Sequence, residues 1–491
     1  VISQPNLIVK DFIITGDSLV SRSEIGKKLS SLVGKPFSPV KTLNAALDIM
    51  RLYKSMGFSF ASIDSLRFDP ESQILFIDLS EGIISKIIIK GNTRTKEKLV
   101  TRELPLNAGE IFEYEKAEKG LTNLRSTNMF DQVELDVKNV SDSNEVTLNV
   151  LEKISGVIRV GMRIDNENYS QVSVDVRDEN LNGTGTELGA TVSGGVRNRS
   201  FVFEQKANRV FDSFLTYKVR AFYEFNDVNV YSDDSTVTEK NSFARIKTAE
   251  YRQIFYGGSF GIGAQVMRLG NLFTEVRFQK EKIKNKSNYF GKPLDVFVTS
   301  LRFSLLVDTQ NDYPYPTDGF LIKSYYETAQ SALGGDIGYT KFLLDYKNFF
   351  SPYKDHTLSL HGVIGSGDNT LPLTEQFSLG GQNSFSGFRD NEYRGRQVLS
   401  ASLEYRYSLP FKIFFDTYIK ARYDLGSIWG EREQIRFKDL KHGVGASLSF
   451  NTPIGPADFS IGRSFYFSDV LSKNTINWGP TYFYFTIGYY Y

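Results

Sequence analysis

The 491-residue sequence contains no cysteine and only three histidines. Without cysteine the chain cannot form a disulfide scaffold, an iron–sulfur cluster, a zinc–thiolate site or a thiol nucleophile. The histidines, His356, His361 and His442, are too few and too scattered along the chain to predict a metal centre. We therefore expect neither a metal ion nor a cofactor.

Charge of one sign and long apolar runs are also missing. The 58 Lys and Arg residues nearly balance the 57 Asp and Glu residues, which gives a formal net charge of +1. That balance argues against a nucleic-acid partner, since a nucleic-acid surface needs an excess of basic residues on at least one face. No run of about 18 predominantly apolar residues occurs, so the sequence predicts no transmembrane helix.

Aromatic residues and glycine, by contrast, are abundant: the chain has 39 Phe, 27 Tyr and 40 Gly. The mean hydropathy of −0.28 is that of a polar chain. It is nevertheless compatible with a transmembrane β-barrel, because lipid-facing and lumen-facing residues alternate along each strand and keep the average polar. The chain begins at Val1 without an initiator methionine or a signal peptide, so we expect a processed or trimmed product.

The first 155 residues contain an internal repeat. Residues 13–17 (IITGD) recur as residues 88–92 (IIKGN), 75 positions later. Each copy reads as a strand, a turn, two helices and two closing strands. We therefore predict two small α+β domains, the first over residues 1–82 and the second over residues 83–154.

From residue 155 to the end, nearly every segment alternates with a period of two. Residues 218–225, 399–407 and 415–424 each place charged side chains on one face and apolar or aromatic side chains on the other. This pattern fits a barrel with lipid outside and a polar lumen. About seventeen segments can be counted, with residues 242–281 the most crowded stretch. Because single-chain bacterial barrels have even strand numbers, we predict a mostly β fold with a 16-stranded transmembrane barrel over 155–491.

Motifs for enzyme chemistry are weak. Residues 257–261 (GGSFG) match the G-x-S-x-G pattern of serine hydrolases. That nucleophile elbow requires a strand, a sharp turn and a helix, whereas this copy opens an alternating strand. Paired carboxylates are common but lie on alternating strands whose charged face is expected to line a lumen. We therefore predict that the protein is not an enzyme.

Three segments differ from the simple strand pattern. A turn rich in Pro, Asn, Asp and Gly joins two long strands and contains Asp308, Thr309, Asp312, Pro316 and Gly319. A long loop at about 368–397 contains Gly380, Gly381, Ser386, Gly387, Phe388 and Arg389. A loop of this length with its own aromatic and cationic residues is typical of one that folds into a pore. The last strand ends with Phe485, Ile487, Gly488, Tyr489 and Tyr491. Its terminal aromatic residues fit an interfacial aromatic belt, but an aromatic residue at the chain end favours a C-terminal assembly signal read by the outer-membrane insertion machinery, and the two roles are compatible.

Taken together, these residues resemble the outer-membrane POTRA–barrel superfamily, which includes the BamA, TamA and two-partner-secretion types. The two repeats resemble POTRA domains, the turn resembles the family's strand-connecting motif, and the glycine-rich loop resembles its pore-folded sixth loop. Residues 424–426 (DLG) and 452–456 (TPIGP) match signatures of late strands. The resemblance covers essentially the whole chain. It implies a bacterial outer-membrane location, with the POTRA units in the periplasm.

The loop tip departs from the family pattern. Insertases of this family usually carry Val-Arg-Gly-Phe/Tyr, whose arginine contacts acidic residues of the barrel wall, whereas this chain has Ser386 in place of that arginine. We expect Arg389, or else Arg394 or Arg396, to take over. Asp424 and Glu404 are the expected wall partners, because both lie on the charged faces of their strands.

The resemblance implies that the protein assembles or translocates other outer-membrane chains. The POTRA edge strands would bind an unfolded or secreted client, and accessory periplasmic proteins or lipoproteins are possible further partners beside the membrane lipids. A weak seam between the first strand (156–165) and the last (481–491) would offer an unpaired edge. The alternative is the membrane part of a patatin-type phospholipase or secretion carrier, because the tip Ser-Gly-Phe resembles that branch.

Overall fold

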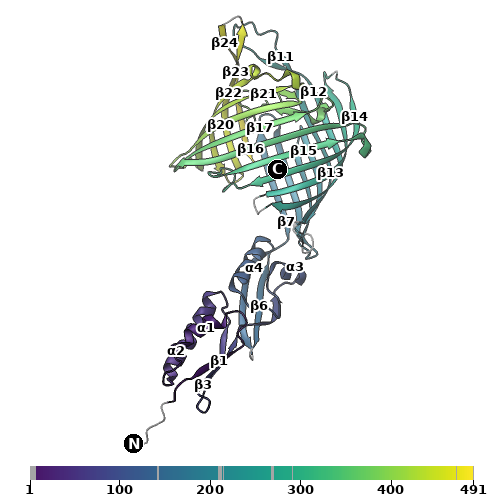
Figure 1. Ribbon diagram of the computed structural model, residues 1–491. Helices are drawn as coiled ribbons and strands as arrows, with labels where there is room; N and C mark the ends of the chain where they lie inside the picture. Colours follow the sequence, from purple (N-terminus) through teal and green to yellow (C-terminus); the bar gives the residue numbers. More distant parts are fainter. Residues whose placement is uncertain are drawn as a thin grey trace. The chain divides into compact units, whose positions relative to one another are not determined.

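The computed structural model describes residues 7–140, 143–207, 209, 213, 215–266, 270–289, 291–470 and 473–489. It divides into two compact units (Figure 1). The first unit comprises residues 1–155 together with Asn180–Gly185, and the second comprises Gly156–Glu179 and Thr186–Tyr491. The segment Asn180–Gly185, which includes the last two residues of a strand of the second unit, thus groups with the first unit. None of the described helices is long and apolar enough to cross a membrane.

The first unit repeats one α+β pattern twice, in agreement with the internal repeat of the sequence. The first copy contains β1 (Asp11–Thr15), α1 (Arg22–Leu29), α2 (Pro39–Ser55), β2 (Ser62–Asp69) and β3 (Ile74–Ser80). The second contains β4 (Ile84–Lys90), α3 (Glu97–Glu103), α4 (Tyr114–Ser126), β5 (Phe130–Val140) and β6 (Ser143–Glu152). The sheet orders are β1-β3-β2 and β4-β6-β5, so the last strand of each copy is central and the other two are edges.

The same backbone turn opens the helical part of both copies. Gly16 and Gly91 have positive φ, and a side chain at either would clash with the carbonyl oxygen of Leu79 or Val150 in the central strand. Two residues beyond those carbonyls, a carboxylate caps each turn. Glu81 accepts hydrogen bonds from the amides of residues 18 and 19, both at 2.8 Å. The repeat seen in the sequence therefore reflects one structural device used twice.

The second unit is a closed antiparallel barrel of sixteen strands among the described residues, which confirms the predicted fold class. Its first eight strands are β7 (Gly156–Asp165), β8 (Tyr169–Leu181), β9 (Thr186–Gly195), β10 (Asn198–Ala207), β11 (Leu215–Asp233), β12 (Arg245–Val266), β13 (Gly270–Ser287) and β14 (Leu294–Asp308). The remaining eight are β15 (Gly319–Ala329), β16 (Tyr339–Tyr353), β17 (His356–Gly367), β20 (Gln397–Ser408), β21 (Asp416–Trp429), β22 (Lys441–Thr452), β23 (Gly455–Val470) and β24 (Lys473–Gly488). Two three-residue strands, β18 (Phe377–Leu379) and β19 (Tyr393–Gly395), form a separate hairpin between β17 and β20.

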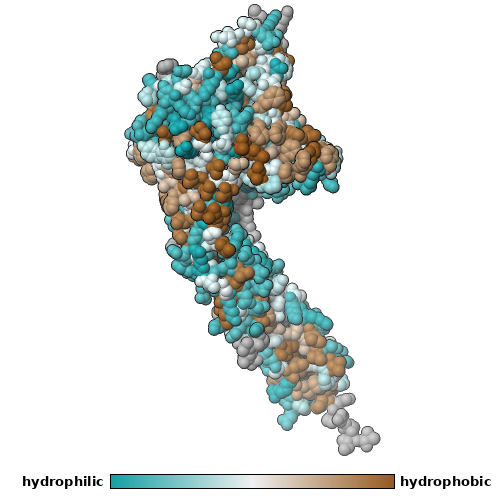
Figure 2. Space-filling view, turned by 180° about the vertical axis from the view of Figure 1, so that it is seen from behind, coloured by the Kyte–Doolittle hydropathy of each residue, from teal (hydrophilic) through white to brown (hydrophobic). Residues whose placement is uncertain are grey.

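The strand faces agree with the alternating sequence pattern. On β21 the apolar residues Ile419 and Tyr423 are exposed, at 48% and 41%, whereas Asp424 is fully buried. Figure 2 shows hydrophobic residues gathered on the outer surface of the barrel. Apolar side chains outside and charged side chains inside are the arrangement that a lipid environment requires.

Long strands explain the ambiguous strand count. The crowded stretch 242–281 holds all of β12, which has 22 residues, and part of β13, which has 18. A strand needs only about ten residues to cross the membrane, so a ten-residue pattern matches a strand of this length twice. The G-x-S-x-G segment lies within β12 and continues as strand, without the helix that a nucleophile elbow requires.

Candidate functional site: the barrel seam and the central loop

The barrel closes at a very short seam. β24 and β7 share three register pairs, in which Thr486, Ile487 and Gly488 face Asp165, Ile164 and Arg163. Fourteen of the other fifteen junctions share between nine and nineteen register pairs. The seam is therefore much weaker than these fourteen junctions.

The short seam results from a stagger between the two strands. β7 turns into β8 just beyond Asp165, whereas β24 extends a further thirteen residues, 473–485, past that point. Among the described residues, 156–162 of β7 likewise have no register partner on β24. Unpaired backbone groups are costly beside hydrocarbon and are a template for another strand.

One side chain, that of Asn166, extends the contact between the two strands beyond the register pair of Asp165 and Thr486. The Asn166 amide nitrogen donates to the carbonyl oxygen of Phe483 at 2.8 Å. Its side-chain oxygen accepts from the backbone N–H of Phe485 at 3.4 Å. The Asn166 side chain thus takes the place of the backbone of a strand residue, because it binds both a donor and an acceptor on the edge of β24.

The loop between β17 and β20 contacts opposite sides of the barrel. Near its start, the Glu375 carboxylate pairs with Lys341 of β16 and accepts from Gln279 of β13 at 3.0 Å. Its tip contacts β21, β23 and β24, which lie six to eight strands away from β13 in the closed order of sixteen. The loop therefore crosses the lumen from one wall to the other.

The barrel wall holds the loop tip through Asp424 and Arg422. The backbone N–H of Ser386 donates to the Asp424 carboxylate at 2.8 Å, and the Ser402 hydroxyl donates to the same group. The Arg422 guanidinium lies 2.7 Å from Asp424 and also donates to the carbonyl oxygens of Gln382, at 3.2 Å, and Ser384, at 2.9 Å. The loop contributes backbone groups, and both charges of the ion pair come from β21.

The tip fits closely against the wall. A side chain at Gly387 would come within 2.2 Å of the Ser464 amide nitrogen, so only glycine fits there. The Gly387 N–H donates to the Tyr484 hydroxyl at 2.9 Å, and that hydroxyl donates to the Phe388 carbonyl at 2.8 Å. Phe385 and Phe388 are buried and stack on one another with ring centroids 4.9 Å apart. The tip is therefore attached directly to β24, the last strand of the seam.

The predicted ion pair between Arg389 and the wall carboxylates is wrong. The Arg389 guanidinium carbon lies 5.2 Å from the centre of the Tyr482 ring. Its backbone N–H donates to Glu392 at 2.7 Å. The physical reason is that Arg422, two residues before Asp424 on the same face of β21, already satisfies that carboxylate. This spacing was visible in the sequence and is the signal that sequence reasoning missed.

The other predicted arginines also bind loop or rim carbonyls instead of wall carboxylates. Arg394 donates to the Leu373 carbonyl at 2.9 Å, and Arg396 donates to the Leu371 carbonyl at 3.3 Å. Glu404 lines a small polar cavity beside the tip together with Ser386 and Arg422. No ion pair between Glu404 and a loop arginine occurs in the part of the chain that the structure describes. Gly380 and Gly381 lie at the start of the tip, where the Gly381 N–H donates to the Phe388 carbonyl at 3.0 Å.

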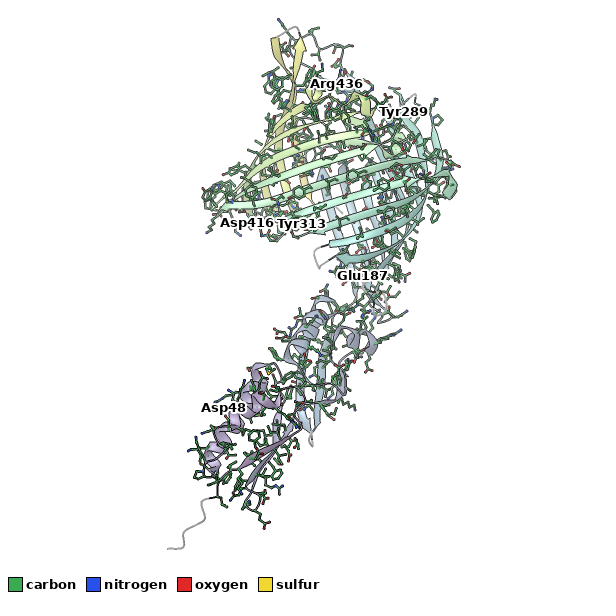
Figure 3. The ribbon with its side chains drawn as sticks, viewed as in Figure 1. Asp48, Glu187, Tyr289, Tyr313, Asp416 and Arg436 are labelled. Atoms are coloured by element: carbon green, nitrogen blue, oxygen red, sulfur yellow. The ribbon has the colours of Figure 1, made fainter. Side chains whose placement is uncertain are left out.

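The strand-connecting turn lies at one rim of the barrel. Figure 3 shows Tyr313 of this turn and Asp416 at the same end, away from Arg436 and Tyr289. Within the turn, the hydroxyl of Thr309 accepts from the Phe320 N–H at 2.9 Å, and Asp308 accepts from the Gln310 N–H at 3.0 Å. These bonds fix a turn whose sequence predicted a rigid shape.

The same turn folds back across several later strands. Asp312 accepts from the Tyr313 N–H at 2.7 Å, the Pro316 carbonyl accepts from Arg406 of β20, and Gly319 begins β15. The Tyr313 ring stacks on Tyr489 at 6.0 Å between centroids. Two segments singled out separately in the sequence, the turn and the chain end, are thus brought together.

In the last strand, Phe485 and Ile487 share the outward face with Phe483, which is 72% exposed. Gly488 packs against the backbone of β7, since a side chain there would come within 1.9 Å of the Met162 carbonyl oxygen. Tyr491 lies outside the described residues.

A 16-stranded barrel with a short seam, an inward-folded loop and a preceding pair of α+β repeats defines the class of POTRA–barrel outer-membrane proteins. Comparison with known families agrees: the profile described as "Omp85 superfamily domain" matches residues 180–490. The POTRA profile described as "Surface antigen variable number repeat" matches residues 83–153. The chain belongs to the Omp85 superfamily, and it is an outer-membrane protein with its POTRA domains in the periplasm.

Relatives and solved structures point to the same group. The chain is 25% identical over 455 residues to "Outer membrane protein assembly factor BamA" of Nitratidesulfovibrio vulgaris, covering 85% of this chain and 55% of that protein. BamA from Haemophilus ducreyi lacking POTRA domains 1–3 is similar in fold, with a TM-score of 0.69, 17% identity and coverage of 98% and 99% of the two chains. CdiB from Escherichia coli has a TM-score of 0.55 at 14% identity, with coverage of 99% of this chain and 91% of its own. The chain thus spans little more than half the length of the first relative.

Proposed function

We propose that the protein assembles or translocates outer-membrane client polypeptides through the seam between β7 and β24. The observation that carries this proposal is the three-pair junction, which leaves seven residues of β7 and thirteen of β24 without a register partner on the other strand in the described chain. Opening three pairs breaks far fewer backbone contacts than opening a junction of nine to nineteen pairs. Each strand edge can then pair with a client strand through its backbone N–H and C=O groups.

The POTRA units supply further sheet edges. β2 and β5 are outer strands, because β3 and β6 occupy the centres of the two sheets. Several side chains of β2 are exposed, and neither strand contains a proline that would block pairing. We propose that these edges bind an unfolded client by β-augmentation and deliver it to the barrel, with accessory periplasmic proteins or lipoproteins as further partners.

The proposed domain boundaries are 1–82, 83–154 and 155–491, and the proposed roles of the motif residues follow from their contacts. Asp424, together with the tip residues Ser386, Gly387 and Phe388, would keep the loop in the lumen while the seam opens and receives a client strand. On this proposal the protein is not an enzyme. A matched relative is named an assembly factor, which supports a role in assembly or translocation. The patatin-linked alternative rests on the loop tip alone.

Folding kinetics of a client test the proposal. A urea-unfolded eight-stranded outer-membrane barrel protein is added to lipid vesicles that contain the full chain, and its folding is followed by heat-modifiable electrophoretic mobility. We expect folding at least tenfold faster than in empty vesicles or in vesicles that contain an unrelated closed porin. An equal rate in all three samples would contradict the proposed function.

A further inference from the structure

The edge of β24 above the seam is partly occupied by another segment of the chain. Ser242, in the connection between β11 and β12, forms a parallel β-bridge with Trp478. The Phe243 N–H donates to the Trp478 carbonyl oxygen, and the Trp478 N–H donates to the Asn241 carbonyl oxygen, both at 3.0 Å. Residues 241–243 therefore satisfy both backbone groups of Trp478, as a strand would.

This bridge is short and joins segments distant in sequence. It lies within the stretch of β24 that β7 cannot reach, because β7 ends opposite Thr486. Residues 241–243 belong to neither β11 nor β12 and pair with β24 only at this position among the described residues. Two backbone hydrogen bonds join the segment to β24, fewer than a longer strand would form, so a longer strand can displace it.

The side chain of Phe243 links this segment to the central loop. Its ring lies 5.0 Å from that of Tyr466 and packs against the buried cluster that contains Phe385 and Phe388. It also lies over Gly479 of β24, where a side chain would come within 2.9 Å of the Phe243 ring. Removing the segment from β24 therefore also uncovers one side of the loop-tip cluster.

We propose that residues 241–243 are a resident placeholder strand, which occupies the edge of β24 at Trp478 until a client strand replaces it. This inference rests on the proposed function, because a placeholder is meaningful only if the edge receives clients. The placeholder keeps this edge of β24 from pairing with unintended strands. When a client strand displaces it, Phe243 leaves the loop-tip cluster, so the binding of a client at β24 changes the packing of the loop tip. Client entry is then a strand exchange and not the filling of an empty edge.

A reversible cross-link tests the placeholder. Directly opposed residues of neighbouring strands lie about 4.8 Å apart, within the range of a disulfide. The chain has no cysteine of its own, so S242C with W478C introduces the only thiols. We expect this disulfide to form in the absence of client. Oxidation should slow client folding in vesicles at least tenfold, and reduction of the same protein should restore the rate.

A matched disulfide separates the placeholder from general stiffening of the barrel. T328C with T340C joins β15 to β16 at an established register pair far from the seam in strand order. Its oxidation should change the folding rate by less than twofold. If the oxidised S242C/W478C protein folds client as fast as the reduced protein, the placeholder is wrong while the proposed function stands. If the wild-type chain does not accelerate client folding, the proposed function fails and this inference fails with it.

Discussion

At the scale of single residues, Asp424 and Arg422 decide whether the loop stays in the lumen. Asp424 is fully buried and Arg422 is its ion-pair partner, while both bind backbone groups of the loop tip. A buried ion pair is weak evidence of net stability, but removing one partner leaves the other charge uncompensated. The two residues therefore act as one latch whose halves depend on each other.

Replacing Arg422 by alanine should release this latch. R422A leaves a buried carboxylate without its cation, a change that typically costs about 3–5 kcal/mol. We expect a lower unfolding temperature of the barrel and a higher single-channel conductance in planar bilayers. R389A is the matched control, because its cation–π contact with Tyr482 is worth only about 0.5–2 kcal/mol. A larger effect of R389A than of R422A on both quantities would contradict the assignment.

A second residue-scale prediction concerns Glu152 in the second POTRA unit. Burial tends to raise the pKa of its carboxyl, but hydrogen bonds from Thr95, Thr93 and Arg94 outweigh this and lower the pKa to about 2. A depressed pKa stabilises the folded state above the ordinary pKa, and that stabilisation is lost as the pH falls through the folded value. Because the group is only partly buried, solvent screens its interactions, and we expect its contribution to be only about 1 kcal/mol.

Urea unfolding of residues 7–155, followed by circular dichroism, checks this expectation. E152Q should be less stable than the wild type at pH 7, and the difference between the two proteins should shrink between pH 4.5 and about 2. Comparing the two proteins at each pH cancels the titration of the other carboxylates. A difference that stays constant over this pH range would show that Glu152 does not act through its charge.

At the scale of elements, the seam depends on how closely β24 approaches β7. G488V places a side chain within 1.9 Å of the Met162 carbonyl oxygen, so the backbone must separate and the three register pairs weaken. We expect at least tenfold faster amide hydrogen exchange at residues 163–165. G362V in β17 is the control, because a side chain there meets no atom within 4 Å. Unchanged exchange in G488V would show that Gly488 does not hold the seam closed.

The alternating pattern predicted the strands and their faces because side-chain direction in a strand depends only on neighbouring residues. Thus Ile419 and Tyr423 were correctly placed outside and Asp424 inside. The partner of Asp424 was predictable from the same pattern, because Arg422 lies two residues away on the same face of β21, but the loop arginines were chosen instead. What the pattern could not show is where the long loop meets β21, and therefore which backbone groups of the tip Asp424 and Arg422 bind.

The seam could also be predicted only in part, because its position follows from the strand pattern whereas its length does not. The sequence places the first and last strands beside one another once a closed barrel is assumed, but the number of pairs depends on the stagger. Strand lengths of ten residues in β7 and sixteen in β24 would allow ten pairs, so the lengths alone do not determine the stagger. The bridge between Ser242 and Trp478 joins segments with no shared pattern, and no sequence signal predicted it.

At the scale of the whole molecule, the two units should fold independently. Each has its own buried clusters, those around Tyr53 and Leu124 in the first unit and that around Phe385 in the second, and the barrel strands pair only with one another. Deleting residues 6–153 should leave a barrel that refolds in detergent and migrates faster on a gel when unboiled, while client folding is impaired. If residues 156–491 cannot refold under conditions where the full chain does, the boundary near residue 155 is wrong.

The central claim is that the seam between β7 and β24 opens during client assembly, and a disulfide across the seam tests it most directly. I164C with I487C joins the middle register pair, and T328C with T340C again serves as the control staple between β15 and β16. With the seam oxidised, we predict that client folding in vesicles falls to the rate of empty vesicles and recovers on reduction, while the control staple has no effect. Client folding at the full rate with the seam fully cross-linked would contradict the account.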